Sequence, residues 1–505
     1  MGFVSLGCPK NLVDSEVMMG LLDRAGAHLT PHMEEAEILV VNTCSFIDAA
    51  KQESVDAILE MARLKSQGRA RKLIVAGCLV ERYREEIQKN IPEVDAVVGT
   101  GELEAILEAA GLKAAPQKPS PFAILSSGQS STKTPARQNQ NGPKGSHGGQ
   151  EAQAGTHKGR PEGEARARRG RFSRKDWQGA TAALPTYLYN ETTPRILTTP
   201  RASAYIKIAE GCDHPCSFCV IPNLRGRFRS RPLASVVAEA ERLVAQGVRE
   251  ITLIGQDTTC YGEDLGLKDG LAQLLETLAG IEELRWLRFL YAYPNRITTK
   301  LLETIARHEK ICKYLDLPLQ HASADVLKRM KRGGSGEIFL KTLAKARKIV
   351  PGIVLRTSFI VGFPGESLRD FELLEDFVRK AKFDWLGVFG YSREEGSEAY
   401  ALDRQLPKRT IESRHKRLMK LQQTISRRAK QQWVGRELTL LAEGPSEETP
   451  LLWEGRSRFH APEIDGKVYI NDFGPLDALE IGRFYRAVIT EAHDYDLVAQ
   501  VVAAE

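Results

Sequence analysis

A rhythm of short strands and longer helices recurs through most of this 505-residue chain and limits the folds that it can adopt. Near its start, apolar runs at 3–6, 38–41, 73–76 and 96–98 alternate with amphipathic stretches of helical period. Strands separated by helices in this way favour a parallel sheet with helices packed on it. We therefore predict an α/β domain over residues 1–112.

The rhythm stops between residues 113 and 183. This segment is rich in Gln, Gly, Ser and Pro, and from Lys113 to Asp176 it carries 13 Lys and Arg against 4 Asp and Glu. A segment of this composition buries too little apolar surface to offset the entropy that a chain loses on folding. We predict a disordered basic linker over 113–183.

A second set of strand–helix units begins at about residue 184, and a long basic helix follows it at 410–432. Six units of this kind predict a partial (β/α)6 barrel, in which the carboxyl ends of the strands carry the chemistry. We assign residues 184–432 to this domain. Its predicted strands are 204–209, 251–255, 286–293, 314–319, 353–361 and 385–391.

Residues 433–505 contain short β-rich runs at 437–442, 467–470, 484–489 and 497–502, separated by Gly, Pro and Asp turns, which predict a small β-barrel. This segment carries 6 Lys and Arg against 14 Asp and Glu. A barrel that binds RNA should be basic, because phosphate contacts supply most non-specific affinity. The acidity therefore favours a basic protein as partner and no specific nucleic acid. An acidic surface that only aids solubility is the alternative.

Several protein classes are disfavoured by the same composition. No apolar run approaches the roughly 20 residues of a membrane-spanning helix. The first residues lack the basic and then apolar pattern of a secretory signal. Eight cysteines in a chain of this length are too few for a disulfide scaffold. We expect a cytoplasmic protein with no membrane partner.

Cys212, Cys216 and Cys219 form a C-x3-C-x2-C motif just after the first predicted barrel strand. A structural zinc site normally closes its tetrahedron with four ligands, and no fourth ligand follows at a matching spacing. Three thiolates on a four-iron cluster leave one iron open to an external molecule. Structural zinc or buried free cysteines remain the alternative.

Cys8, Cys44 and Cys78 each follow an apolar strand run and precede a helical stretch. The carboxyl ends of parallel strands share one edge of a sheet, so the three thiols can converge there. Any one of them alone would be interpreted as a buried structural cysteine. Three in corresponding positions indicate a second cluster site.

Together these motifs resemble the radical S-adenosylmethionine (SAM) superfamily and, within it, the methylthiotransferases. The resemblance is carried by C-x3-C-x2-C with an aromatic residue before its last cysteine, by GCPKN at 7–11, and by the residues around Cys44 and Cys78. It implies a flavodoxin-like N-terminal domain, a radical SAM barrel and a C-terminal TRAM domain. It also implies two four-iron, four-sulfur (4Fe-4S) clusters on the six cysteines, and SAM as the source of a 5′-deoxyadenosyl radical and of the methyl group.

The family has two branches, of which one modifies adenosine in transfer RNA. The other, the RimO type, modifies an aspartate β-carbon of small-subunit ribosomal protein S twelve. The stretch 5–16 (SLGCPKNLVDSE) resembles the RimO branch, whereas the transfer RNA branch usually has Gln-x-Asn after its first cysteine. Stretches 314–323, 356–366 and 387–396 also resemble the RimO branch.

We therefore expect a ribosomal protein methylthiotransferase, which needs a reductant such as flavodoxin or ferredoxin and a sulfur donor. The transfer RNA enzyme is the nearest alternative. A non-enzymatic iron–sulfur factor of the ribosome is an alternative from another class.

Three further residues are predicted to bind the cofactor. Phe218 would pack against the adenine of SAM by the superfamily's pattern, with plain core packing as the alternative. Gln256 ends the second barrel strand, where polar side chains tend to be functional. Gly362 ends the fifth, where a glycine permits close approach of the backbone to a ligand, although a simple turn fits equally well. We predict no catalytic side-chain nucleophile.

The remaining polar side chains near these motifs have ordinary structural interpretations. His321 fits a satisfied structural histidine better than a catalytic one. Some of the arginines at 225, 227, 229 and 231 could clamp the SAM carboxylate, but a solvated basic loop is the default for most of them. Cys260 and Cys312 are predicted to be packing residues.

Overall fold

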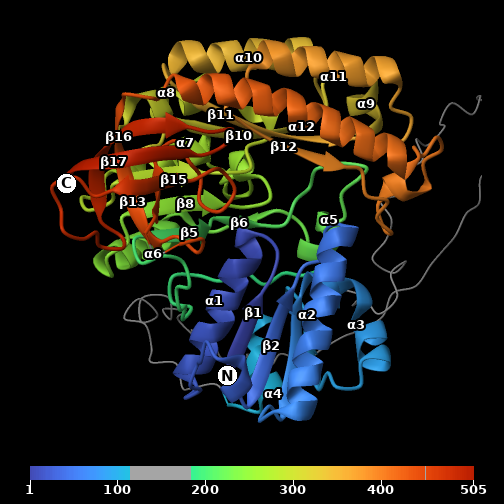
Figure 1. Ribbon diagram of the computed structural model, residues 1–505. Helices are drawn as coiled ribbons and strands as arrows, with labels where there is room; N and C mark the ends of the chain where they lie inside the picture. Colours follow the sequence, from blue (N-terminus) through green and yellow to red (C-terminus); the bar gives the residue numbers. More distant parts are fainter. Residues whose placement is uncertain (114–183, 450) are drawn as a thin grey trace, which may run out of the picture. The chain divides into compact units, whose positions relative to one another are not determined.

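The computed structural model describes residues 1–113, 184–449 and 451–505 (Figure 1). The predicted linker therefore lies almost entirely outside the described residues. The fold class predicted from the sequence, α/β with a partial barrel and a C-terminal β-barrel, is confirmed.

The N-terminal domain is a four-stranded parallel sheet in the order β1-β2-β3-β4. Successive side chains of a strand point to opposite faces. Accordingly Leu39 and Val41 face the cluster of α2 and α3, whereas Val40 faces that of α1 and α4. The elements are β1 (Gly2–Ser5), α1 (Pro9–Arg24), β2 (Ile38–Thr43), α2 (Asp48–Gln67), β3 (Lys72–Gly77), α3 (Cys78–Asn90), β4 (Ala96–Val98) and α4 (Ile106–Ala110).

The middle domain has six parallel strands in two three-stranded sheets, β5-β8-β9 and β10-β11-β12. A parallel bridge between Leu287 and Ile311 links the end of the first sheet to the segment before β10. The strands are β5 (Ser203–Lys207), β8 (Glu250–Ile254), β9 (Trp286–Phe289), β10 (Tyr314–Gln320), β11 (Val354–Val361) and β12 (Trp385–Gly390). All six overlap the strands predicted from the sequence.

Helices alternate with these strands along the chain and bury an apolar face on them (Figure 1). Several begin at a serine whose hydroxyl accepts a backbone N–H bond, and Ser367 forms a capping box with Asp370. The helices are α6 (Leu233–Ala245), α7 (Gly270–Ala279), α8 (Thr299–Arg307), α9 (Ala324–Arg329), α10 (Gly336–Ile349), α11 (Leu368–Ala381) and α12 (Lys408–Gln431). Three short elements, β6 (Ala209–Glu210), α5 (Ile221–Arg225) and β7 (Arg229–Ser230), flank the cysteine motif.

The C-terminal domain is a closed barrel in the order β13-β14-β15-β17-β16. Its strands are β13 (Glu437–Pro445), β14 (Trp453–Ser457), β15 (Val468–Asp472), β16 (Phe484–Ala492) and β17 (Leu497–Ala504). Four of the five were predicted. None of the described helices is long and apolar enough to cross a lipid bilayer.

Candidate functional site

The three N-terminal cysteines lie at the carboxyl ends of neighbouring parallel strands. Cys8 is the N-cap of α1, Cys44 follows β2, and Cys78 begins α3 directly after β3. A side chain at Gly7, whose φ is +92°, would place its Cβ 2.7 Å from the Cβ and 3.0 Å from the Sγ of Cys44. The loop that carries Cys8 therefore passes directly against Cys44, and glycine at position 7 makes that approach possible.

The same three thiols influence one another electrostatically. The pKa of Cys78 is raised to about 12, mainly by burial and also by the neighbouring Cys44 and Cys8, whereas Arg225 acts to lower it. Burial also raises the pKa of Cys44, with Cys8 the next largest cause. The three sulfurs thus share one site, and ligation of a metal there would release the protons that burial retains.

Arg225 connects this site to the barrel. Its Nη2 lies 3.5 Å from the Sγ of Cys78 and 3.2 Å from Oδ1 of Asn11, and its Nη1 is hydrogen-bonded to Asp14. Arg225 is the last residue of α5, the helix that follows the C-x3-C-x2-C loop, and is only 2% exposed. The sequence-based interpretation of a solvated basic loop is therefore wrong for Arg225, and also for Arg231, which is fully buried.

Asp14 and Glu210 neutralise two buried cations, Arg225 and Lys207. The Lys207 ammonium lies 2.5 Å from Oδ1 of Asp14 and 2.5 Å from Oε2 of Glu210. Burial alone would raise the pKa of Glu210, but Lys207 and Arg225 outweigh it and lower that pKa to about 2. The contact between the two domains at this point is a closed network of opposite charges, which fixes side-chain positions more rigidly than isolated pairs do.

The second triad lies between β6 and α5. The pKa of Cys212 is raised to about 12, mainly by burial, and Cys216 is the side chain that contributes most to this rise. The Sγ of Cys216 lies 3.5 Å from Nη1 of Arg332. Ser217 lies between Cys216 and Cys219, and its N–H donates to the Met330 carbonyl at 3.0 Å, which holds the loop in place.

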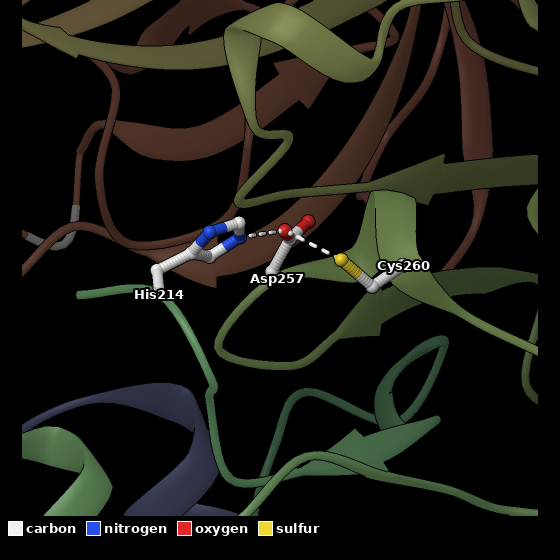
Figure 2. Close-up of side chains that lie close together, drawn as sticks. All are labelled: His214, Asp257 and Cys260. Carbon is white, nitrogen blue, oxygen red and sulfur yellow. Dashed lines mark hydrogen bonds and ion pairs between the residues drawn. The ribbon is translucent and has the colours of Figure 1, made fainter. Parts of the chain in front are cut away.

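His214 anchors the same loop to the barrel (Figure 2). Its Nε2 lies 2.5 Å from Oδ2 of Asp257, which follows β8, and the Cys260 thiol donates to the same oxygen at 3.0 Å. The His214 ring stacks on Tyr293 with centroids 3.9 Å apart. The Arg332 guanidinium lies 4.5 Å from the centroid of the same Tyr293 ring. The cysteine loop is therefore fixed by side chains that follow β8 and β9 and by Arg332, which follows α9.

The donor atoms fit iron–sulfur clusters better than single zinc ions. Within the described part of the chain, the one trio of ligating atoms that lies within 4.8 Å is that of His214, Asp257 and Cys260. In neither cysteine triad do all three sulfurs lie within 4.8 Å of one another, whereas tetrahedral zinc at 2.3 Å would hold its sulfurs about 3.8 Å apart. A cluster separates its thiolates because each binds a different iron. Each triad also has one sulfur that accepts a guanidinium hydrogen bond.

The three residues predicted to bind SAM occupy distinct surroundings. Phe218 is partly buried against the barrel core. The amide of Gln256 donates to Oε1 of Glu210 at 2.6 Å, and its own Oε1 has no partner among the described residues. A Cβ on Gly362 would lie 2.4 Å from Ile411 in α12, so the close approach that this glycine permits is to a helix. Their binding of the cofactor stays a prediction.

The structure adds residues that the sequence analysis did not single out. Tyr291 and Arg332 belong to no motif of the sequence analysis, and Lys10 was included there only as part of GCPKN at 7–11, with no role assigned. Asp257 lies next to the predicted Gln256 at a strand end, and that position was a usable signal. His321, by contrast, is buried: burial lowers its pKa to about 3, its Nδ1 accepts the Ser323 N–H at 2.9 Å, and its Nε2 has no hydrogen-bond partner among the described residues, so the predicted satisfaction holds for one ring nitrogen.

Comparison with known proteins agrees with this geometry. Residues 1–99 match the model described as Uncharacterized protein family UPF0004, residues 206–378 match the Radical SAM superfamily, and residues 434–502 match the TRAM domain. A protein of Koribacter versatilis (strain Ellin345), named ribosomal protein uS12 methylthiotransferase RimO, is 65% identical over 505 residues, which cover 99% of this chain and 96% of that protein. The chain belongs to the RimO family.

A second RimO protein, from Solibacter usitatus (strain Ellin6076), is 53% identical over 505 residues that cover 100% of this chain and 95% of its own. Among solved structures, TsrM of Kitasatospora setae, a radical SAM methyltransferase with cobalamin and a 4Fe-4S cluster bound, is 16% identical with a TM-score of 0.49. That likeness covers 79% of this chain and 73% of TsrM.

Proposed function

We propose that this chain attaches a methylthio group to the β-carbon of an aspartate of ribosomal protein uS12, using SAM. The observation that carries the proposal is the pair of cysteine triads linked through Arg225, which hydrogen-bonds to Cys78 and lies six residues after Cys219. Its relatives are named for this activity. A transfer of sulfur to an unactivated carbon needs a radical source and a sulfur source close together, and two adjacent sites of this kind meet that need.

The C-x3-C-x2-C loop would hold the cluster that binds SAM. Three thiolates leave one iron open. Bound there, the cluster and SAM supply radical chemistry that removes a hydrogen atom from carbon. The chain's own part is to fix the loop: Asp257 holds His214, Met330 holds Ser217, and Arg332 donates to the Cys216 sulfur. These contacts set the orientation of the ligands, as outer hydrogen bonds do in metal sites.

Cys8, Cys44 and Cys78 would hold the second cluster, where the sulfur is brought to the substrate carbon. Cys44 and Cys78 are buried, and Cys8 is partly exposed. Such burial excludes water, which protects reactive species from side reactions. The sulfur donor and a reductant such as flavodoxin or ferredoxin would act from outside the chain.

The acidic C-terminal barrel supports a protein substrate over transfer RNA. Residues 433–505 carry an excess of eight acidic side chains over basic ones. Phosphate repels such a surface, whereas a basic ribosomal protein is attracted to it. Transfer RNA modification is the second candidate, and the matched TRAM domain alone does not separate the two.

Three experiments test the proposal. Anaerobic iron and sulfide analysis of the reconstituted chain should give about eight irons, whereas stoichiometric zinc without iron would contradict it. Cys216→Ala should abolish formation of 5′-deoxyadenosine from SAM. Mass spectrometry of ribosomal proteins and transfer RNA from a strain that lacks the gene should then show the methylthio group missing from uS12 alone. Loss from transfer RNA would establish the other branch.

A further inference from the structure

Lys10 is a buried ammonium with no carboxylate beside it. The residue is 8% exposed, and no ion pair joins it to an acidic side chain in the described ranges. The nearby buried cations are all paired: Lys207 and Arg225 share Asp14, which lies one helical turn after Lys10 in α1. Burial of an unpaired charge is costly. A buried lysine that its own chain leaves without a counter-ion therefore indicates a charge supplied by a ligand.

The Lys10 ammonium lies over the ring of Tyr291, 3.2 Å from its centroid. Tyr291 follows β9 and has a φ of +64°, a conformation unfavourable for a side chain of this size. Its N–H donates to Oδ2 of Asp316 at 2.9 Å, and its carbonyl accepts from the Thr258 N–H at 3.2 Å. Neighbouring segments thus hold the strained backbone in place, as is common at ligand sites.

The third observation is that the Lys10–Tyr291 pair is connected to both cysteine triads. Lys10 lies two residues after Cys8, whose thiol acts on it electrostatically. Tyr291 lies two residues before Tyr293, which stacks on His214 in the other cysteine loop. Contacts of neighbouring residues therefore connect Lys10 to both triads, and a carbon that loses hydrogen to one site and gains sulfur from the other must lie near both.

We propose that Lys10 binds the side-chain carboxylate of the target aspartate and so selects an acidic residue as substrate. This inference rests on the proposed function. The carboxyl group is bonded directly to the β-carbon, so a cation that holds it also positions the reacting carbon. An ammonium–carboxylate pair in a desolvated site is strong and directional. An asparagine offers only a neutral amide and leaves the charge of Lys10 unpaired.

The test compares two ligands and three forms of the reconstituted holoenzyme with SAM present. One peptide carries the target aspartate of uS12, and the other has asparagine in its place. The wild-type chain should bind the aspartate peptide about tenfold more tightly or better, since removing one partner of a close buried charge pair has effects of at least this size. Lys10→Gln should bind both peptides with nearly equal Kd. Lys89→Gln, on the exposed end of α3, should retain the full preference.

The iron content distinguishes substrate binding by Lys10 from a role of Lys10 in supporting the cluster site at Cys8. Lys10→Gln should retain the iron content of the wild type; loss of about half the iron would mean that Lys10 supports the Cys8 site, and it would overturn the proposal. An undiminished aspartate preference in Lys10→Gln would overturn it as well. If that variant does not fold, Lys10→Met, which keeps the aliphatic stem, is measured in the same way. Failure of the wild type to cleave SAM or modify uS12 would instead contradict the proposed function.

Discussion

Arg225 of the barrel domain lies 3.5 Å from the sulfur of Cys78 in the N-terminal domain. It is fully enclosed there with Asp14 and Asn11, so the guanidinium acts as a structural tie and as a local positive charge. Hydrogen bonds and charge near sulfur ligands raise the reduction potential of iron–sulfur clusters. The helix that follows one triad thus contributes to the electrostatics of the other.

We expect Arg225→Lys to lower the midpoint potential of the N-terminal cluster. Lysine keeps the charge near Asp14 but cannot reach Cys78 and Asn11 with a planar fork of donors. Potentiometry followed by electron paramagnetic resonance measures the change. Arg227→Lys, two residues along and exposed, is the matched control and should leave both potentials unchanged. Equal potentials in wild type and Arg225→Lys would show that this contact has no electronic role.

Gly7→Ala should disrupt the N-terminal site selectively. The new methyl group would lie 2.7 Å from the Cβ of Cys44, so that cysteine must move. We predict that reconstituted iron falls from about eight to about four atoms per chain. Gly26→Ala is the control, because Gly26 has nearly the same φ of +91° but no atom within 4 Å of the added Cβ. It should cost about 1 to 2 kcal/mol of stability and no iron. Full iron in Gly7→Ala would refute the assignment.

Asp257→Asn should slow SAM cleavage about 10- to 100-fold, the size of effect that outer hydrogen bonds have at metal sites, because it loosens the loop that carries the three cysteines. Asp257 accepts from both His214 and Cys260 and so anchors the cysteine loop (Figure 2). The rate of 5′-deoxyadenosine formation is the measurement. Cys260→Ala keeps the contact between His214 and Asp257, and it should retain most of the activity. The reverse order of the two variants would mean that the loop is held in another way.

Glu250 should make the fold sensitive to acid. It is buried, 2.7 Å from Arg456 of β14 and 3.2 Å from Arg288 of β9. Burial raises its pKa, but the two arginines outweigh this and lower the pKa from 4.5 to about 2. Since the folded-state pKa lies below the unfolded one, the stabilisation is complete above pH 4.5 and is lost as the pH falls toward 2.

Glu250→Gln should reduce the free energy of unfolding at pH 7 by about 3 to 5 kcal/mol, because it removes the carboxylate that pairs with buried Arg288 and one of the two that pair with Arg456. The difference from wild type, measured by urea unfolding, should shrink between pH 4.5 and 2. Acid loss of clusters affects both proteins alike and cancels in this difference. Glu337→Gln, which removes an exposed pair with Lys341, should follow the wild-type profile. Parallel curves for wild type and Glu250→Gln would contradict the prediction.

Most strands of the first two domains could be predicted because they contain apolar runs between breakers, as at Ile251 to Ile254. β14 was missed because its residues, Trp453 to Ser457, include Glu, Gly, Arg and Ser, and its pairing with β13 and β15 supplies the order that its own composition lacks. The local sequence pattern therefore predicts strands whose own residues are apolar, and it misses a strand that depends on pairing with its neighbours.

The cysteines of the site could also be predicted, because their positions at strand ends are a property of the chain. The side chains around them could not. Arg225 is buried only because Asp14, 211 residues away, meets it in space, and an exposed loop arginine has the same local sequence. Lys10 is likewise enclosed by Tyr291 from another domain. Tertiary contacts decide the roles of both.

Transfer of deuterium tests the central claim most directly. The reconstituted enzyme is given reductant, SAM and uS12 whose aspartate is deuterated at the β-carbon, and the 5′-deoxyadenosine is analysed by mass spectrometry. The account predicts that one deuterium appears in 5′-deoxyadenosine for each methylthio group formed. Methylthiolated uS12 accompanied by unlabelled 5′-deoxyadenosine would contradict it.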